Sequence, residues 1–239
     1  QEKVYTSLSE LRYGRLMIMT DADHDGSHIK GLILNMIEFF WPSLLDLGFV
    51  VSMVTPIIKA TKGSRTESFY SETAFKQWWD AQSGSGWKIK YYKGLGTSTS
   101  KEAQEYFKNI KNLTVRFDVD EQTHDSLVLA FDKKRADHRK QWLLKNTETP
   151  PEELSYGEIS NLPITEFFNR DMVKFSLADL HRSVAHMCDG LKPSQRKILF
   201  ACFKRNIKSE IKVAQLASIA AEVSSYHHGE VSLADTIVK

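Results

Sequence analysis

The chain has 239 residues, of which 41% are hydrophobic and 26% charged, enough for the core of one large domain or two medium ones. A net charge of +2 excludes a strongly acidic or basic protein, and no apolar run reaches the roughly 18 residues that a membrane helix needs. The two cysteines, Cys188 and Cys202, have no disulfide or zinc spacing, and we expect free buried thiols in a reducing compartment. Because the first residue is Gln1, we expect a piece of a longer protein.

The first half of the chain alternates predicted strands and helices. The apolar run at residues 16–19 is typical of a strand buried on both faces, and a helical period of apolar residues follows at 28–45. Residues 49–60 and 87–92 read as further strands, with a helix over 73–80 between them. This alternation predicts an α/β sheet.

The second half changes character after a polar segment rich in proline and glycine, residues 145–163, where we expect a domain boundary. Beyond it, Pro193 fits the first turn of a helix that runs to about residue 203. A second helix is predicted over residues 213–223, and a third begins near Glu230. The last part of the chain is therefore expected to be mainly helical.

Between the first strand and the first helix stands the acidic segment T-D-A-D-H-D-G-S-H, residues 20–28. Its three aspartates repel one another, so we expect a cation to compensate their charge. The segment begins like a calcium loop, but the position of the closing glutamate is Leu32 and a strand precedes it, which argues against calcium. Mg²⁺ at the carboxyl end of a buried strand, sharing one or two carboxylates with a phosphate, fits better. A solvated turn that caps the helix at Ser27 would explain one or two of the aspartates, but not all three.

Five motifs, in order along the chain, resemble the type IIA DNA topoisomerases. Residues 12–31, R-Y-G-R-L-M-I-M-T-D-A-D-H-D-G-S-H-I-K-G, resemble the acidic half of their Toprim module, and residues 91–102, Y-Y-K-G-L-G-T-S-T-S-K-E, resemble their Y-K-G-L-G motif. Three later stretches resemble their winged-helix DNA-binding domain: D-G-L-K-P-S-Q-R-K at 189–197, K-V-A-Q-L-A at 212–217 and Y-H-H-G-E at 226–230. Toprim and winged helix on one polypeptide is similar to the eukaryotic or viral arrangement.

The resemblance implies a fold and its division. We expect an α/β Toprim domain with a mostly parallel sheet and flanking helices over residues 1–145, and a linker over 146–180. A mainly helical winged-helix (helix-turn-helix) domain follows over residues 181–239.

The resemblance also implies an activity, an ATP-dependent topoisomerase that breaks both DNA strands by tyrosine transesterification and passes a second duplex through the break. It makes Asp21 and Asp23 ligands of one or two Mg²⁺ ions, with Asp25 as a supporting carboxylate. It places Arg182 beside the scissile phosphate and His228 at the cleavage site. The nucleophilic tyrosine, the glutamate of the family's E-G-D-S-A motif and the ATP-binding module are not among these residues, so we expect this piece alone to be inactive.

The implied partners are double-stranded DNA and a second copy of the full-length enzyme, in the nucleus or on a mitochondrial genome, with no membrane. Seven basic and two acidic residues between Asp189 and Lys212 form a positive block that suits a polyanion, although such a block can also be a solvated helix face. The residues expected to contact DNA are basic or polar: Lys93, Lys192, Arg196, Lys197, Lys204, Arg205, Lys212, Gln215 and His227.

Other interpretations of these residues stay open on sequence alone. Arg182 also suits a surface position, and Val184-Ala185 replaces the proline that the family usually carries shortly after this arginine. Adjacent histidines such as 227 and 228 often only hydrogen-bond within a turn, and small residues such as Ala214 and Ala217 also suit close helix packing. Two alternative functions are another Toprim enzyme, such as a nuclease or primase, and a non-catalytic module that binds DNA or calcium.

Overall fold

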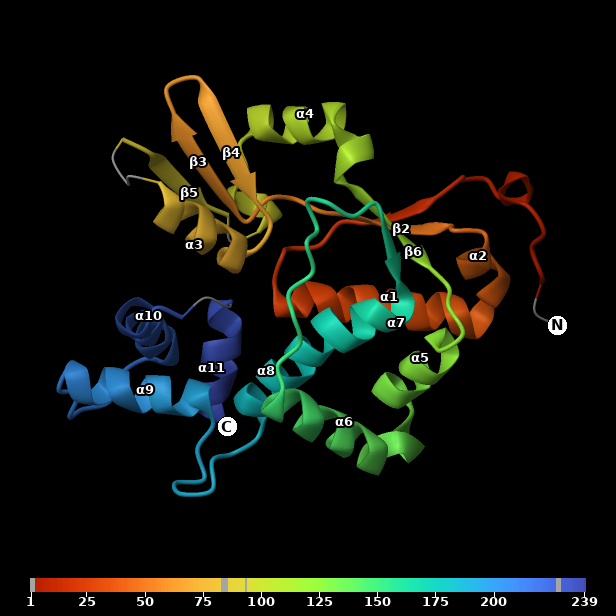
Figure 1. The fold of residues 1–239 in the computed structure, drawn as a ribbon. Coiled ribbons are helices and arrows are strands. Elements are labelled where there is room, and N and C mark those ends of the chain that lie inside the picture. The colour runs from red at the N-terminus through yellow and green to blue at the C-terminus, as the bar shows by residue number, and fades with distance from the viewer. Residues whose placement is uncertain (1–2, 83–85, 93, 227–228) are drawn as a thin grey trace. The chain divides into compact units, whose positions relative to one another are not determined.

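The computed structural model describes residues 3–82, 86–92, 94–226 and 229–239. The chain forms two compact units, Gln1–Ser176 and Leu177–Lys239. The first unit contains all the strands that the described residues form, and the second is helical (Figure 1). None of the described helices is both long and apolar enough to span a membrane.

A four-stranded sheet forms the centre of the first unit, in the order β1-β2-β6-β7. Its strands are β1 (Leu16–Ile18), β2 (Val50–Met53), β6 (Thr114–Asp118) and β7 (Asn161–Pro163). The pairs β1–β2 and β6–β7 are parallel, whereas β2–β6 is antiparallel. Two of the three pairings are therefore parallel, which confirms the predicted mostly parallel α/β sheet.

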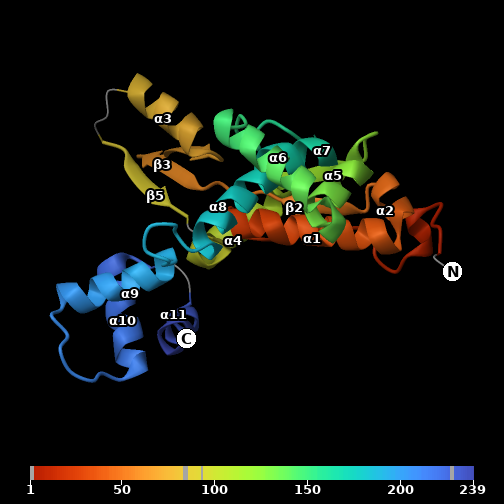
Figure 2. The ribbon, with the colours of Figure 1, turned by 90° about the horizontal axis from the view of Figure 1, so that it is seen from below.

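Helices pack beside this sheet and enclose the main core (Figure 1 and Figure 2). They are α1 (His24–Phe40), α5 (Thr123–Phe131) and α7 (Ile164–Phe167), which continues as the π-helical turn η5 (Phe168–Met172). The core side chains come from both layers: Leu34, Ile37, Val50, Phe117, Leu127, Phe167 and Phe168.

The first predicted helix, over residues 28–45, is in fact two helices. α1 begins earlier, at His24, and ends at Phe40, and α2 (Pro42–Asp46) follows after Trp41. Pro42 explains the break, because proline lacks the amide hydrogen of the helical ladder and restricts the residue before it. Pro42 instead occupies the first turn of α2.

A second, three-stranded sheet in the order β4-β3-β5 was not predicted. It contains β3 (Ile58–Lys62), β4 (Arg65–Phe69) and β5 (Lys88–Tyr91), all antiparallel, with α3 (Glu72–Ala81) packed on it through Phe75 (Figure 1). The single strand predicted over residues 49–60 is therefore β2 and β3, in different sheets. Pro56 lies between them, where a residue without an amide hydrogen interrupts strand pairing.

Shorter or peripheral elements complete the first unit: η1 (Leu8–Glu10), η2 (Leu95–Thr97), α4 (Ser100–Lys108), η3 (Ile110–Leu113), η4 (Lys133–Arg135) and α6 (Ala136–Glu148).

One face of α1 is apolar yet open to solvent. Ile29, Leu32, Met36 and Phe39 are 46%, 45%, 44% and 68% exposed, while Leu34 and Ile37 on the opposite face are buried. Among the described residues, β1 pairs with β2 alone, so it is an edge strand of its sheet.

The expected linker over residues 146–180 is largely part of the first unit. β7 pairs with β6, Leu162 is 1% exposed, and the compact unit extends to Ser176. The prolines and the lack of periodicity in this segment correctly indicate an irregular backbone. An irregular segment can nevertheless contain a short buried strand at the edge of a sheet.

The second unit is a three-helix arrangement of α9 (Pro193–Lys204), α10 (Val213–Ser224) and α11 (Glu230–Val238), preceded by the end of α8 (Val173–Ser183). All three predicted helices are confirmed, with Pro193 in the first turn of α9. Their core contains Ile198, Ala201, Leu216, Ala220 and Leu233. Cys202 packs against this core, but Cys188 is exposed, so the prediction of a buried thiol is wrong for Cys188.

Burial of β7 can be tested by truncation. Leu162→Ala should lower the free energy of unfolding by about 2–5 kcal/mol, because it leaves a cavity in the main core. Leu144→Ala is the matched control, since Leu144 in α6 is 55% exposed and its truncation should change stability by less than about 0.5 kcal/mol. Urea unfolding of both variants measures the difference, and equal small effects would mean that residues 149–163 are not packed in the core.

Candidate functional site

The acidic turn lies between β1 and α1, as predicted, but the helix uses part of it. Asp23 is the N-cap of α1, and its Oδ1 accepts a hydrogen bond of 2.7 Å from the backbone N–H of Gly26. Asp25 lies in the first turn, where a carboxylate is favoured by the helix dipole. Capping of α1 therefore falls to Asp23 and not to Ser27.

Two glycines lie in close contact with Asp21. A Cβ atom on Gly26 would lie 2.1 Å from the backbone oxygen of Asp21, and one on Gly94 would lie 2.4 Å from its carboxyl carbon. A side chain at position 26 would meet the backbone, and one at position 94 would have to displace the carboxylate of Asp21. The loop of the Y-K-G-L-G motif thus lies directly against the carboxylate of Asp21, and two motifs far apart in the sequence meet at one place.

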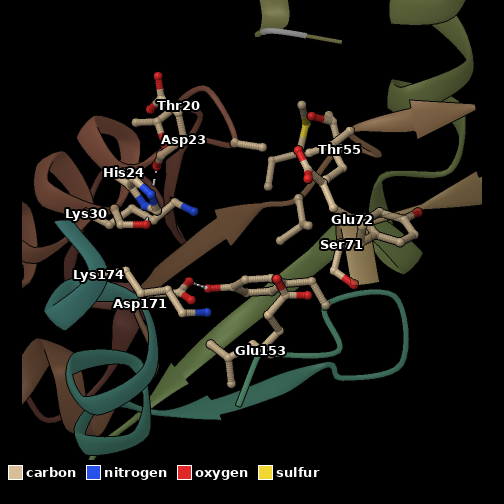
Figure 3. Close-up of a pocket in the computed structure, with 18 residues that line it drawn as sticks. Thr20, Asp23, His24, Lys30, Thr55, Ser71, Glu72, Glu153, Asp171 and Lys174 are labelled. Atoms are coloured by element: carbon tan, nitrogen blue, oxygen red, sulfur yellow. Dashed lines mark hydrogen bonds between the residues drawn. The ribbon is translucent and has the colours of Figure 1, made fainter. Parts of the chain in front are cut away.

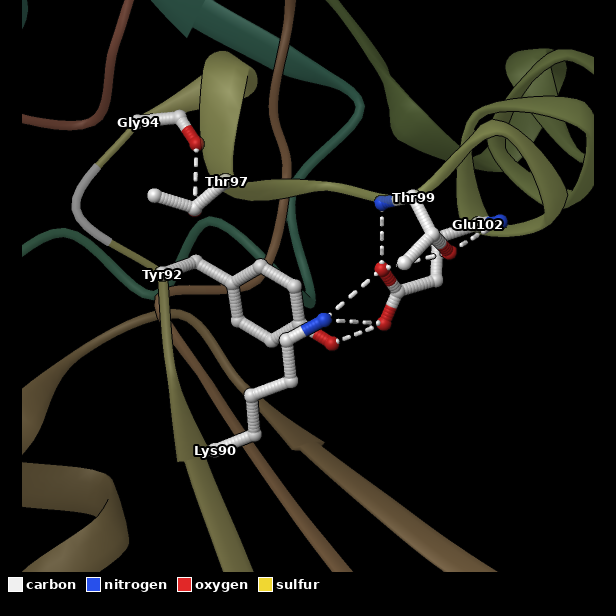
Figure 4. Close-up of polar contacts among 6 residues, drawn as sticks. All are labelled: Lys90, Tyr92, Gly94, Thr97, Thr99 and Glu102. Carbon is white, nitrogen blue, oxygen red and sulfur yellow. Dashed lines mark hydrogen bonds and ion pairs between the residues drawn. The ribbon is translucent and has the colours of Figure 1, made fainter.

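A hydrogen-bonded network fixes this loop between β5 and α4 (Figure 4). Lys90 Nζ lies 2.9 Å from both carboxylate oxygens of Glu102, and the hydroxyl of Tyr92 donates to the same carboxylate. Glu102 also accepts from the backbone N–H of Thr99, the N-cap of α4, at 2.7 Å. Thr97 Oγ1 donates to the carbonyl oxygen of Gly94 at 2.7 Å, so the loop is held on both sides of its glycines.

The network sets the charge of Glu102. Burial raises the pKa of its carboxyl, but the hydrogen bonds from Thr99, Tyr92 and Lys90 outweigh burial and lower the pKa to about 2. Burial and the bond to Glu102 raise the pKa of the Tyr92 phenol well above its ordinary value. At neutral pH the carboxylate is therefore charged and the phenol remains a donor, which keeps the network intact.

The acidic turn offers the ligand type that Mg²⁺ prefers, but few protein ligands. Asp21 and Asp23 are exposed and offer the hard oxygen ligands that Mg²⁺ prefers. In the described part of the chain, however, no group of three or more His, Cys, Asp or Glu side chains could hold a metal. The turn therefore suits an ion whose remaining ligands are waters or a phosphate. It does not suit an ion that is bound by protein ligands alone.

Other predicted site residues lie in the second unit or outside the described residues. Arg182, near the end of α8, forms an ion pair with Asp179 one turn earlier, at 3.2 Å, and is about half exposed. Lys93, His227 and His228 lie outside the described residues. A cleft shared by the acidic turn and Arg182 therefore stays a prediction.

Several members of the predicted DNA surface already have partners within the second unit. Arg196 pairs with Asp189 and Arg205 with Glu222, each at 2.8 Å. The bond from Arg196 lowers the pKa of the Asp189 carboxyl. These pairs are exposed, so a phosphate can replace the carboxylate at little energetic cost.

The lysines of this surface differ from the arginines. Lys197 lies over the ring of Tyr226 at 5.5 Å, and Lys204 over that of Phe200 at 5.4 Å. Lys192 and Lys212 are exposed, and neither forms an ion pair with a residue that the structure describes. The amino groups of these two lysines are therefore accessible.

Helix α10 divides its small residues between two roles. Ala217 and Ala220 are buried in the core of the second unit, which is the packing role that sequence alone left open. Ala214, Gln215 and Ser218 are exposed. A DNA backbone can therefore approach only this second group.

A cavity of about 480 Å³ lies beside the acidic turn and was not predicted from the sequence (Figure 3). Asp23, the N-cap of α1, and Lys30 within α1 line it, together with Tyr156, Asp171 and Lys174 from the segment predicted to be a linker. Lys30 lies on the same helical face as the buried Gly31 and Leu34, but the apolar period in the sequence fell on Ile29, Leu32 and Met36, so the burial of Lys30 could not be predicted. A charged residue on a buried face is a reason to look for a site.

Comparison with known proteins places the chain in a family. The family described as "C-terminal associated domain of TOPRIM" matches residues 53–180, which is more than half of the chain. Residues 182–239 match the family of the A subunits of DNA gyrase and topoisomerase IV. A protein of Dictyostelium discoideum named "Probable DNA topoisomerase 2" is 51% identical over 99% of the chain. The chain belongs to the type IIA DNA topoisomerases.

Other type IIA topoisomerases agree with this. Human "DNA topoisomerase 2-alpha" is 49% identical over 97% of the chain. The crystal structure of the Plasmodium falciparum topoisomerase II DNA-binding, cleavage and re-ligation domain is 47% identical and superposes with a TM-score of 0.79, covering 100% of this chain and 32% of that one. The chain spans only 16% of the length of the Dictyostelium and human relatives.

The low pKa of Glu102 predicts a pH-dependent stability. A carboxyl whose pKa falls on folding stabilises the folded state above its unfolded pKa, near 4.5, and this stabilisation is lost as the pH falls towards 2. Glu102→Gln should therefore be less stable than the wild type at pH 7, by about 1–3 kcal/mol, with the difference shrinking between pH 4.5 and pH 3.

Urea unfolding at several pH values measures this difference. Glu105→Gln is the control, because Glu105 lies on the same helix and is exposed. A difference between wild type and Glu102→Gln that did not change with pH would contradict the assigned pKa.

Proposed function

We propose that this chain is part of the DNA-binding and cleavage core of an ATP-dependent type IIA topoisomerase. Such an enzyme makes a transient, Mg²⁺-assisted double-strand break by tyrosine transesterification and passes a second duplex through it. The observation that carries the proposal is the packing of Gly94 against the carboxylate of Asp21, which joins two motifs of the family at the carboxyl end of β1. Identities of 47–51% to topoisomerase II proteins support it.

The acidic turn would hold the metal. Asp21 and Asp23 would bind one or two Mg²⁺ ions, and Asp25 would support them from the first turn of α1. When bound, Mg²⁺ supplies positive charge that stabilises the leaving 3′-oxygen and anchors a neighbouring phosphate. The chain's own contribution is to fix where the carboxylate of Asp21 lies, through the two glycines that touch it.

The catalytic residues of the second unit act on the phosphate and the nucleophile. Arg182 would donate a two-pronged pair of hydrogen bonds to a non-bridging phosphate oxygen, in place of its present bond to Asp179. His228 would position the attacking tyrosine, since a neutral imidazole can hold a hydroxyl group.

DNA would bind along α9, α10 and their connection. Lys192, Lys204, Lys212 and Gln215 are exposed there, and Lys197, Arg196 and Arg205 would exchange their present partners for phosphates. Lys93 and His227 complete the proposed set. Because these contacts are mainly to phosphates, binding should be weakly sequence-specific and strongly dependent on salt.

The remaining parts of the proposal concern the whole protein. We infer a homodimer that binds ATP in a further domain and acts in the nucleus or on a mitochondrial genome. The eukaryotic origin of the relatives supports the location. A Toprim nuclease or primase and a non-catalytic module are disfavoured, because residues 182–239 match a second family, that of the A subunits of DNA gyrase and topoisomerase IV.

The full-length enzyme tests the metal assignment. Asp21→Asn and Asp23→Asn should each lower Mg²⁺-dependent DNA cleavage about a hundredfold or more, since a ligand of the charge-stabilising ion is lost. DNA affinity should stay within about twofold, because an Asn side chain adds no repulsion towards phosphate. Asp137→Asn, at an exposed position in the first turn of α6, is the control. Cleavage at the wild-type level in both Asn variants would refute the assignment.

The contact between the motifs gives a second test. Gly94→Ala would push the carboxylate of Asp21 aside, and Mg²⁺ affinity measured by calorimetry should fall about tenfold, which corresponds to about 1.4 kcal/mol. Gly96→Ala is the matched control in the same loop, because a Cβ atom there meets nothing within 4 Å. Equal affinities of the two variants would show that the position of Asp21 does not govern metal binding.

A further inference from the structure

The cavity beside the acidic turn is formed within the first unit by distant segments of the chain. Asp23, His24 and Lys30 lie on one side of it, with Asp171 and Lys174 next to them, and Ser71 and Glu72 face them from the start of α3 (Figure 3). Its volume of about 480 Å³ is within the range of small-molecule sites, which is about 300–1,000 Å³. The cavity therefore has room for more than a single ion.

Lys30 is the unusual group in this cavity. It is 7% exposed, yet no hydrogen bond to a described residue and no ion pair with one within 4.0 Å is found for its ammonium. Its ammonium lies 5.6 Å from the centre of the Tyr156 ring. Burial lowers the pKa of Lys30, partly offset by the charges of Asp171 and Asp23. Lys30 Nζ is not among the described buried atoms that lack a partner, so the stem of Lys30 is buried while its ammonium reaches the surface of the cavity, where water or a ligand can accept its hydrogen bonds.

The carboxylates around Lys30 are engaged elsewhere or face solvent. The hydroxyl of Tyr156 donates to Asp171, and Asp23 caps α1. Glu72 and Glu153 are exposed. The cavity therefore presents two ammonium groups, the largely buried Lys30 and the partly buried Lys174, beside the partly buried carboxylate of Asp171, and its two exposed carboxylates are Glu72 and Glu153.

We propose that this cavity binds a phosphate group, whose oxygens accept hydrogen bonds from Lys30 and Lys174. Because four carboxylates and two ammonium groups line the cavity, the phosphate is expected to bind together with a divalent cation that offsets Asp23 and Glu72. The phosphate can come from a free polyphosphate or from a DNA backbone. The proposal rests on the fold of the first unit and does not require that the protein cleave DNA.

Calorimetry with the 239-residue chain tests the site. The probes are sodium pyrophosphate, with and without MgCl₂, and a short blunt duplex without terminal phosphates. We expect saturable binding that is stronger with MgCl₂ and at least tenfold weaker in Lys30→Met and in Lys174→Met. Lys145→Met, at an exposed position in α6 outside the cavity, should bind like the wild type.

The two probes distinguish the source of the phosphate. Pyrophosphate binding that depends on Lys30 would assign the cavity to a free polyphosphate. If only duplex binding depends on Lys30, and pyrophosphate binding does not, the cavity would be assigned to a phosphate of the DNA backbone. If neither probe binds, or if Lys30→Met and Lys174→Met bind both probes as the wild type does, the proposal is overturned.

Thermal unfolding separates a ligand-binding lysine from a structural one. If Lys30 serves a ligand, Lys30→Met should have a midpoint equal to or above that of the wild type, since a buried charge is removed. Pyrophosphate with MgCl₂ should raise the midpoint of the wild type but not that of Lys30→Met. A midpoint of Lys30→Met more than about 5 °C below that of the wild type would make Lys30 a structural counter-ion, and would overturn the proposal.

Discussion

Mutual repulsion among the carboxylates of residues 21–25 is the constraint on which the first unit depends. The fold meets it with several independent devices. Asp23 and Asp25 lie at the N-terminus of α1, and the charge of Asp23 favours the ammonium form of Lys30, whose pKa burial lowers. Asp21 instead faces the glycine loop. The three carboxylates of the turn are therefore shared between two parts of the structure, the N-terminus of α1 and the glycine loop.

Sequence alone revealed the parts of the protein that have strong local signals. The apolar run before the turn at 20–28 predicted the strand β1, although β1 lies at the edge of its sheet and only Ile18 in it is buried, so burial on both faces is wrong. Pro193 marks the start of α9 in the structure, as predicted. The motif resemblance identified the family, which the comparisons confirm. Local signals of this kind depend on neighbouring residues, so they can be read before the fold is known.

What sequence could not reveal depends on contacts between distant residues. Leu162 reads as part of a proline-rich loop, and only its pairing with β6 makes it a core residue. The cavity around Lys30 likewise needs Tyr156 and Asp171, which a linker would not bring to α1. The contact of Gly94 with Asp21 follows no spacing rule. Each of these features arises from tertiary packing, which periodicity does not encode.

The open apolar face of α1 has a practical consequence. Side chains such as Phe39 and Leu32 form an exposed apolar surface of the kind through which folded chains associate. Self-association of the 239-residue chain would cover this face and grow with concentration. Light scattering over a dilution series, in the buffer used for the titrations, would therefore measure the self-association of the chain.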